Sequence, residues 1–506
     1  MQNLDMIDLI IIGGGPGGYI AAVQAARLGL SVTLIEEREL GGVCLNRGCI
    51  PTKTLIDTAK SLDAIRDGKR RGIALTGSLA VDLKTAVQFK QRVTKRLGMG
   101  VEALLRDSGV NIVKGTAVVR PDLTVEVMAG RSTDSGGDGS IATRNTKSIA
   151  TSNSLQAKKI ILATGTVPLR PPIPGSDDPR VLTSDELLEL EAVPDSLAVL
   201  GGGVIAVEMA RIFSTFGANV HVIEALERLC PFLDAELSQA LTQTMVARNG
   251  SIATRNKIKV STGVKLERIE SRNDRLVLHL DNCGSHCSHG STVEASHLPL
   301  AVGRAVDGRA FESLDLRRKG QFVAVDDLMQ TSHPDVYAVG DVNGLCQLAH
   351  AAYRMGEIAA SHAARSLLND ISIPIPEFHA ELVPGCIFSD PEIGHVGLTE
   401  ARAMERFGHI RVGRVPLVAN GRAVVSGHSD GFVKVIADSA TEKIVGVQMI
   451  GLFASELINE AATAIANGLT VSQWGHVIHA HPSIAEALPE AALDGFARSL
   501  HLPQKK

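Results

Sequence analysis

The sequence has few aromatic residues and no excess of charge of either sign. Aromatic residues make up 3% of its 506 residues, and 51 basic residues stand against 55 acidic ones, a formal net charge of -4. This near balance gives no reason to expect a nucleic-acid partner or a polybasic membrane contact. Hydrophobic residues account for 44% and charged residues for 21%, which is ordinary globular composition and excludes wholesale disorder. At this length we expect two to four domains.

Long apolar runs and targeting signals are also missing. The apolar stretch 9–12 is followed at once by glycine and is far too short for a membrane span, so we expect no membrane insertion. The start, MQNLDMIDLIIIGGG, lacks the basic region of a signal peptide and the Arg and Ser content of a transit peptide. Seven cysteines are an odd number for a disulfide scaffold. We expect a cytoplasmic protein, in which a close cysteine pair is more often catalytic than structural.

Glycine, in contrast, is abundant, and its first cluster lies inside a strand–helix–strand pattern. The expected elements are a strand over 8–12, a helix over 19–28 and a strand over 31–35. Between the first two stands the motif Gly-x-Gly-x-x-Gly, formed by Gly13, Gly15 and Gly18. Such glycines let the backbone approach a pyrophosphate, whose negative charge the helix N-terminus faces. Glu36 ends the second strand, where it can accept a hydrogen bond from a ribose hydroxyl, so the pattern predicts a dinucleotide site rather than an ordinary turn.

A second copy of this pattern begins with a strand at Leu197. Its loop residues are Gly201, Gly203 and Ala206, and the small alanine meets the packing requirement of the third position. Glu224 ends the following strand, where its carboxylate would bind a ribose diol and repel a 2′-phosphate. The pattern therefore favours NAD over NADP.

Two cysteines stand five positions apart in GGVCLNRGCIPTK, residues 41–53. Cys44 and Cys49 lie on what is expected to be a loop entering a helix, whose dipole would favour the Cys49 thiolate. A closely spaced pair in a reducing compartment suggests a redox-active disulfide. Two buried, inert cysteines are the alternative, and a zinc site is disfavoured because only two ligands are local.

This segment resembles the redox-active motif of the pyridine nucleotide–disulfide oxidoreductases. Further motifs of that family follow in its order along almost the whole chain: ATG at 163–165, TSHPDVYAVGD at 331–341, DPEIGHVGLTEA at 390–401 and HAHPSIAEA at 479–487. The resemblance implies an α/β fold with two Rossmann-like dinucleotide-binding domains and a C-terminal α+β dimerisation domain. The implied boundaries are an FAD-binding domain over 1–174, an NAD-binding domain over 175–304, a central segment completing the FAD site over 305–375 and an interface domain over 376–506.

The resemblance also implies roles for individual residues. Cys44 matches the interchange thiol that reacts with substrate sulfur, and Cys49 matches the thiol next to the flavin. His481 matches the base and Glu486 its orienting carboxylate, whereas His479 is expected to be structural or solvated. The residues implied for FAD are Gly13, Gly15, Gly18, Glu36, Lys53, Gly115, Thr164, Gly165, Asp341 and Ala349. Those implied for NAD are Gly201, Gly203, Ala206, Glu208, Glu224 and Gly303, with Glu208 also matching the partner of Lys53 in an ion pair beside the flavin.

The implied activity is oxidation of protein-bound dihydrolipoyl thiols by NAD⁺, through a Cys44–Cys49 disulfide and FAD. Such a thiol is mostly protonated at neutral pH and needs a base. The implied partners are a second copy of the chain, which supplies the His–Glu pair, and a lipoyl-bearing protein of a 2-oxo acid dehydrogenase complex or glycine cleavage system. Alternatives are a reductase of glutathione or mercuric ion, which Glu224 and the absence of a C-terminal cysteine pair disfavour, or a non-catalytic scaffold, which the intact cysteine pair and His481 disfavour.

Four stretches depart from the family pattern. AVGRAVDGRAFE, residues 301–312, lacks the usual Pro-Asn, which affects the expected loop geometry but not the chemistry. GSIATRN occurs at 139–145 and again at 250–256, and we expect both copies to be surface insertions. CGSHCSHG, residues 283–290, holds two Cys and two His, but its spacing fits no zinc pattern and we expect no metal there.

Overall fold

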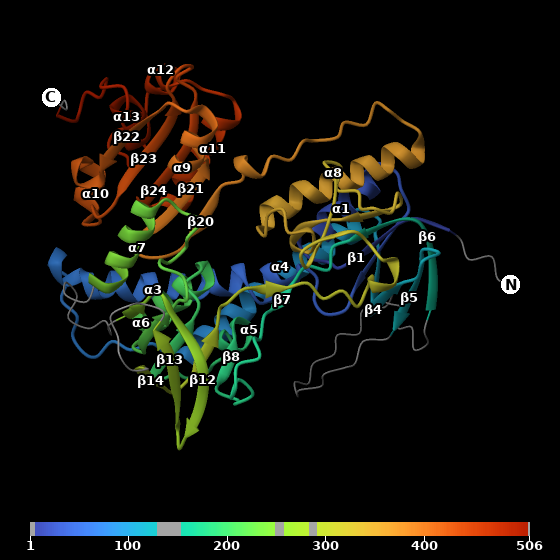
Figure 1. Cartoon of the computed structure of the whole chain (residues 1–506), viewed down its shortest axis with the longest axis horizontal. Coiled ribbons are helices and arrows are strands. Elements are labelled where there is room, and N and C mark those ends of the chain that lie inside the picture. Colours follow the sequence, from blue (N-terminus) through green and yellow to red (C-terminus); the bar gives the residue numbers. More distant parts are fainter. Residues whose placement is uncertain (1–5, 129–152, 248–257, 283–290, 504–506) are drawn as a thin grey trace. The chain divides into compact units, whose positions relative to one another are not determined.

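The computed structural model describes residues 6–128, 153–247, 258–282 and 291–503 (Figure 1). The chain divides into two compact units, each assembled from three segments. The first unit comprises Met1–Pro51, Phe89–Val167 and Arg304–Ala380; the second comprises Thr52–Gln88, Pro168–Gly303 and Glu381–Lys506. Both GSIATRN copies and the CGSHCSHG stretch lie outside the described residues, and the four domain boundaries stay predictions.

A parallel sheet forms the centre of the first unit. Its strands, in spatial order, are β3 (Asn111–Lys114), β2 (Val32–Glu36), β1 (Ile7–Ile12), β6 (Asn153–Leu162) and β19 (Val336–Ala338). Residues 9–12 of β1 are all buried, as expected for a central parallel strand covered on both faces. The start of β6 also pairs antiparallel with β5 (Thr124–Met128), which pairs with β4 (Thr116–Val119).

Two helices of the first unit cross closely beside this sheet. They are α1 (Pro16–Arg27) and α8 (Ala349–Leu368), which run side by side in Figure 1. A Cβ on Gly356 would lie 2.4 Å from the carbonyl oxygen of Gly17, and one on Gly17 would lie 3.3 Å from that of Ala352. Glycine at these positions therefore lets the first turn of α1, next to the first glycine loop, pack closely against the N-terminal half of α8.

Several helices follow one another between residues 42 and 107. The structure has α2 (Gly42–Asn46), α3 (Cys49–Asp67), a 3₁₀ turn η1 (Gly68–Arg71) and α4 (Leu83–Asp107). Residues 72–82 are not helical, and Gly72 and Gly77 there have φ of 77° and 115°. Helix α3 begins at Cys49 and holds Pro51 in its first turn, where the missing N–H needs no partner.

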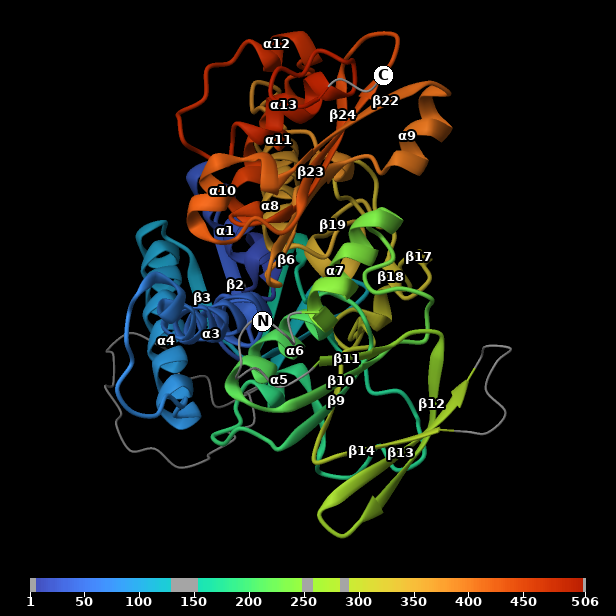
Figure 2. The same ribbon diagram turned by 90° about the vertical axis from the view of Figure 1, so that its left-hand side faces the viewer.

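The second unit contains the predicted second strand–helix–strand pattern. Its parallel sheet has the order β11 (Ile258–Ser261), β10 (Asn219–Ile223), β9 (Ser196–Leu200), β15 (Leu298–Leu300) and β8 (Val181–Thr183). Its helices are α5 (Ser184–Leu187), α6 (Val204–Phe216) and α7 (Ala235–Ala247). Residues 206–216 of α6 are all buried, so this helix belongs to the core. An antiparallel sheet of β12 (Val264–Arg272), β13 (Arg275–Asn282) and β14 (Ser291–Ala295) follows (Figure 2).

The C-terminal part of the second unit is an antiparallel sheet covered by helices on both faces. Its strand order is β20 (Gly385–Ile387), β21 (Glu392–Gly397), β24 (Ile444–Gly451), β23 (Phe432–Asp438) and β22 (Ile410–Pro416). Helices α11 (Ala454–Ala466) and α13 (Ala487–Asp494) pack on one face, where a Cβ on Gly394 or Gly413 would meet their backbone. Helix α9 (Glu400–Phe407) packs on the other face, against Ile436 (Figure 2). This arrangement confirms the predicted fold class.

Several short elements complete the description. They are β7 (Val167–Pro168), β16 (Arg304–Ala305), β17 (Arg318–Lys319), β18 (Phe322–Val323), η2 (Glu312–Leu314), η3 (Gly340–Asn343), η4 (Ala380–Leu382), η5 (Leu417–Ala419), α10 (Gly421–Ser426) and α12 (Val471–Gly475). Within the described residues, no helix is both long enough and apolar enough to cross a membrane. The cytoplasmic location stays a prediction from the sequence.

Candidate active site

The first glycine loop, between β1 and α1, has two glycines that no larger residue could replace and a third that lies beside open space. Gly13 has φ of 102°, and a Cβ there would lie 2.3 Å from the carbonyl oxygen of Ala163. A Cβ on Gly18 would lie 1.8 Å from the carbonyl oxygen of Gly13. At Gly15 the atom nearest to an added Cβ would be 3.9 Å away, so the loop has room for a ligand group at the N-terminus of α1.

Glu36 ends β2 directly beside this loop. Its Oε2 accepts a hydrogen bond from the Gly14 N–H at 2.6 Å, and its Oε1 accepts one from the Arg38 N–H at 2.7 Å. Burial raises the pKa of the Glu36 carboxyl, partly offset by these backbone donors. The Gly115 N–H donates to the Glu36 carbonyl oxygen at 3.0 Å. Gly115, another residue predicted for FAD, therefore lies at the same end of β2.

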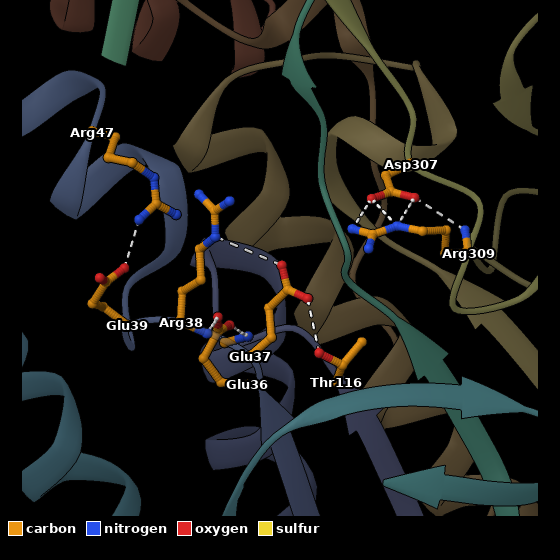
Figure 3. A network of polar contacts seen from close by, with 9 residues as sticks. Glu36, Glu37, Arg38, Glu39, Arg47, Thr116, Asp307 and Arg309 are labelled. Atoms are coloured by element: carbon orange, nitrogen blue, oxygen red, sulfur yellow. Dashed lines mark hydrogen bonds and ion pairs between the residues drawn. The ribbon is translucent and has the colours of Figure 1, made fainter. Parts of the chain in front are cut away.

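Charged side chains surround the Glu36 strand end (Figure 3). Glu37 lies 3.7 Å from Arg38 and accepts a hydrogen bond from the Thr116 hydroxyl at 3.3 Å. Arg47 donates to Glu39 at 2.5 Å. Asp307 and Arg309, which form an ion pair nearby, come from the stretch that lacks the family's Pro-Asn. That stretch is held to β4 by a hydrogen bond from the Val119 N–H to the Ala310 carbonyl oxygen at 2.8 Å.

Asp341 and Thr164 add a buried polar region to the first unit. The Thr166 hydroxyl donates to Asp341 Oδ2 at 2.9 Å, and Arg304 Nε donates to the Thr166 hydroxyl oxygen at 2.8 Å. Burial raises the pKa of Asp341, which the Thr166 hydrogen bond partly counteracts. The Thr164 hydroxyl is buried and has no hydrogen-bond partner in the described part of the chain. An unsatisfied buried hydroxyl is costly, so this atom is suited to a bound ligand.

The remaining predicted residues of this region lie next to the same features. Gly165 has φ of 65° and open space at its Cβ position, and Ala349 is the first residue of α8. Open space at Gly15, the carboxylate of Glu36 and the unpartnered Thr164 hydroxyl together fit a bound dinucleotide such as FAD.

The cysteine pair lies at two helix starts of the first unit. Cys44 is half-buried within α2, and Cys49 is exposed as the first residue of α3. The helix N-terminus at Cys49 is therefore as predicted, although Cys44 lies in a short helix rather than a loop. A thiolate at this position is favoured by the helix dipole.

Two tyrosines lie next to Cys44 and were not predicted as site residues from the sequence. The rings of Tyr19 and Tyr353 lie 5.9 Å apart, at the point where α1 and α8 cross. Burial raises the pKa of Tyr19, as do the hydrogen bond with Tyr353 and the nearby Cys44. The only available signal was the rarity of tyrosine, of which the sequence has three.

Lys53 and Glu208 form an ion pair in the second unit. Lys53 Nζ lies 2.8 Å from one carboxylate oxygen of Glu208 and 2.9 Å from the other. Glu208 Oε1 also accepts the Phe388 N–H at 3.1 Å, and Lys53 Nζ lies 4.6 Å from the centroid of the Phe388 ring. Lys53 stands one helical turn after Cys49 on α3, so the same helix carries the thiol and a cation held by a buried carboxylate.

The second glycine loop, between β9 and α6, repeats the geometry of the first. Gly201 has φ of 112°, and a Cβ there would lie 2.3 Å from the carbonyl oxygen of Ala301. Nothing lies within 4 Å of a Cβ placed on Gly203. Ala206 is fully buried at the position where Gly18 of the first loop has no room for a Cβ. The third position of the second loop therefore has room for an alanine side chain, and the loop stays open at Gly203.

Glu224 occupies in the second unit the place that Glu36 has in the first. Its Oε1 accepts the Leu226 N–H at 2.6 Å, and a Cβ on Gly202 would lie 2.8 Å from its Oε2. Gly303, with φ of 118°, also leaves open space at its Cβ position. A carboxylate against an open glycine loop fits a dinucleotide with free ribose hydroxyls, such as NAD.

His481 and Glu486 form a pair in the C-terminal part of the second unit. His481 Nδ1 lies 3.0 Å from Glu486 Oε1, and the Ser483 N–H donates to Glu486 Oε2 at 2.7 Å. Burial would raise the pKa of Glu486, but the hydrogen bonds from Ser483 and His481 hold it below its usual value. The side chain of His481 is 80% exposed. A carboxylate bound to Nδ1 orients the imidazole and leaves Nε2 for proton transfer.

Comparison with known proteins decides the family. The family model described as pyridine nucleotide-disulphide oxidoreductase matches residues 7–356, and that of the family's dimerisation domain matches residues 383–492. The chain belongs to the pyridine nucleotide-disulphide oxidoreductase family. The predicted resemblance is confirmed, and with it the class of flavoprotein disulfide oxidoreductase that uses FAD and a pyridine nucleotide. The match to the dimerisation domain supports the predicted homodimer.

Individual members of this family resemble the chain over nearly its full length. The dihydrolipoyl dehydrogenase of Bacillus subtilis is 34% identical over 98% of this chain and 99% of its own length. That of Chlorobaculum tepidum is 35% identical over the same shares. Among solved structures, LpdA of Mycobacterium tuberculosis has a TM-score of 0.82 at 25% identity, covering 96% of this chain and 99% of its own. The HOCl-induced flavoprotein disulfide reductase RclA of Escherichia coli has a TM-score of 0.77 at 26% identity, with the same coverage.

No metal centre accompanies these sites in the described ranges. Between residues 6 and 503, outside the gaps noted above, no group of three or more His, Cys, Asp or Glu side chains is arranged to hold a metal ion. The CGSHCSHG stretch is not among the residues described.

Proposed function

We propose that this oxidoreductase converts the dihydrolipoyl group of a partner protein to its disulfide form, with NAD⁺ as the final electron acceptor. The observation that carries the proposal is the His481–Glu486 pair, in a chain that also places Cys49 at the start of α3. A dithiol substrate needs a base to become nucleophilic and a disulfide to receive its electrons. The similarity to dihydrolipoyl dehydrogenases over nearly the whole chain supports the same substrate.

The two glycine loops would hold the cofactors. For FAD, we infer that Gly15 admits the pyrophosphate, Glu36 accepts from a ribose hydroxyl, and the Thr164 hydroxyl and Asp341 bind further polar groups. For NAD, Gly203, Glu224 and Gly303 take the corresponding places. When bound, FAD supplies transfer of two electrons between the dithiol and the nicotinamide.

The protein's own residues would carry out the thiol chemistry. His481 takes the proton from one substrate thiol, while Glu486 stabilises the resulting imidazolium. The substrate thiolate attacks the Cys44 sulfur, a substrate–Cys44 bond forms, and Cys49 leaves as a thiolate. The second substrate thiol then displaces Cys44, which leaves as a thiolate and takes up the proton of that thiol; the lipoyl disulfide closes and both cysteines are left reduced. The helix N-terminus at Cys49 favours its departure as an anion.

The partners of the reaction follow from the same proposal. His481 and Glu486 would act on the cysteine pair of the other subunit, so each homodimer would have two shared sites. The high exposure of His481 is in keeping with a side chain that works outside its own subunit. The lipoyl group would arrive on a protein of a 2-oxo acid dehydrogenase complex or of a glycine cleavage system.

Steady-state kinetics test the substrate and the nucleotide together. Purified protein should be yellow, oxidise dihydrolipoamide, and show a higher kcat/KM with NAD⁺ than with NADP⁺, because Glu224 would repel a 2′-phosphate. Absence of dihydrolipoamide oxidation by the yellow protein would refute the proposed substrate. A higher kcat/KM with NADP⁺ would refute the role given to Glu224.

A pair of glycine variants tests the second loop as the NAD site. Gly203→Ala should raise the KM for NAD⁺ by about 10- to 100-fold, because its Cβ meets no atom of the chain but would occupy space left for the nucleotide. Its thermal stability and FAD content should stay at the wild-type level. Gly201→Ala should instead destabilise the second unit by about 2–5 kcal/mol, because of its φ and the Ala301 carbonyl. An unchanged KM in Gly203→Ala would place the nucleotide elsewhere.

A further inference from the structure

One side chain in the loop that carries His481 is turned inward. The loop connects α12 with α13, and from His476 to Pro482 every residue is exposed except His479. Ile478 is 97% exposed and the His481 side chain 80%, whereas the His479 side chain is 11% exposed. His479 therefore anchors a stretch that otherwise has little contact with its own subunit.

Both ring nitrogens of His479 face oxygens. Nδ1 lies 3.0 Å from the Val477 carbonyl oxygen, and Nε2 lies 2.7 Å from Glu460 Oε1. A carbonyl oxygen and a carboxylate both accept hydrogen bonds, so each nitrogen must carry a proton to satisfy its partner. A neutral imidazole would direct one lone pair at an oxygen. The geometry is thus that of an imidazolium paired with a carboxylate.

The carboxylate of Glu460 is held by a residue of the hydrophobic core. Its Oε1 also accepts the indole N–H of Trp474 at 2.8 Å, which makes a proton on that oxygen unfavourable. Trp474 is 1% exposed and packs among the apolar side chains beneath α11 and α13. A buried indole, a carboxylate and a histidine therefore form one connected chain from the core to the loop.

The charge of His479 also reaches the catalytic pair. His479 is among the groups that lower the pKa of Glu486, after the hydrogen bonds from Ser483 and His481. Glu460 on α11 is paired with His479, and Glu486, the partner of His481, lies within electrostatic range of it.

We propose that His479 is a positioning residue, held as an imidazolium between Glu460 and the Val477 carbonyl, that fixes the loop presenting His481 and keeps a positive charge beside Glu486. The inference rests on the proposed function of His481 as the base. It assigns to the first histidine of the HAH sequence a role that the sequence analysis left as structural or solvated.

Charge-removing variants test this role. Glu460→Gln keeps the size and an acceptor for Trp474 but loses the negative charge, and His479→Gln loses the cation. Both should slow reduction of the holoenzyme by dihydrolipoamide by about 10-fold, through misplacement of the base. Both should leave the rate from NADH to an artificial acceptor unchanged, since that path does not use His481. The double variant should be no slower than the slower single variant, because the two residues act as one unit.

Two controls separate the charge from simple packing. Glu456→Gln, on an exposed residue one turn earlier on α11, should keep the wild-type rate. His479→Arg, which retains a cation with two donors, should be faster than His479→Gln. Trp474 is the only tryptophan of the chain, so its fluorescence emission should change in Glu460→Gln and not in Glu456→Gln.

Different results would overturn the role of His479 and the proposed function. Wild-type rates of dihydrolipoamide oxidation in both Glu460→Gln and His479→Gln would overturn the role of His479 and leave the proposed function intact. A wild-type protein that accepts electrons from NADH but is not reduced by dihydrolipoamide would overturn the proposed function itself.

Discussion

Replacing Cys49 by serine is expected to abolish oxidation of dihydrolipoamide while electron flow from NADH to an artificial acceptor survives. Serine cannot form the disulfide with Cys44, so the substrate thiolate has no sulfur–sulfur bond to attack. The glycine loops and Glu36 are untouched, so FAD binding should persist. Stopped-flow mixing with dihydrolipoamide and a separate NADH assay measure the two paths on the same preparation.

Cys386→Ser is a matched control for this change. Cys386 lies on β20, apart from the cysteine pair, and its Sγ makes only a long contact of 3.8 Å with the Ser455 carbonyl oxygen, so little is lost when serine replaces it. Both activities should remain at the wild-type level. If Cys49→Ser still oxidised dihydrolipoamide, the Cys44–Cys49 disulfide would not be the electron acceptor and the thiol steps proposed above would be wrong.

Replacing His481 by glutamine is expected to slow dihydrolipoamide oxidation by about 10²- to 10⁴-fold, the usual cost of losing a positioned base. Glu486→Gln should cost less, because the imidazole remains but loses the charge that orients it. FAD content and the NADH path should be unchanged in both variants. Single-turnover reduction by dihydrolipoamide is the decisive measurement, because it isolates the thiol steps from nucleotide binding.

The exposed His476, in the same loop, provides the control. His476→Gln changes a histidine that directly follows α12, and it should keep the wild-type rate. Full activity in His481→Gln would require another proton acceptor near Cys44. The inference of a site shared between subunits would then lose its main support.

The lowered pKa of Glu486 sets the pH range of this pair. Because folding lowers the pKa of the carboxyl, its stabilising contribution is fully present above the ordinary carboxyl pKa. That contribution is lost as the pH falls through the lowered value. We therefore expect the His481–Glu486 contact to persist throughout the neutral range.

Local sequence patterns were enough to predict the two dinucleotide loops. A strand, a glycine motif and a carboxylate at the next strand end involve few residues and depend on backbone conformation. Gly13 and Gly201 have positive φ, and each would clash with a neighbouring carbonyl if it carried a Cβ. Such constraints act along short stretches of chain, so they can be recognised in the sequence before any packing is known.

Helix boundaries around the cysteine pair were harder to predict from the sequence. The sequence predicted a loop at Cys44 that enters a helix near Cys49, whereas Cys44 lies within the short helix α2 and α3 begins at Cys49. Pro51 lies in the first turn of α3, where a proline is tolerated. The short α2 follows Gly41 and begins at Gly42, and the positive φ of both glycines turns the chain into it.

By itself, the sequence determined the fold class and the family, and it predicted both dinucleotide loops, the reactive cysteines and the base, because each corresponds to a short motif or to a resemblance to a family. Only the tertiary structure decided which distant residues meet. Thr166 contacts both Arg304 and Asp341, and Tyr19 meets Tyr353 beside Cys44. His479 acquires its two acceptors from Val477 and, through packing of α11, from Glu460. Such contacts depend on how helices and strands pack, which no local pattern specifies.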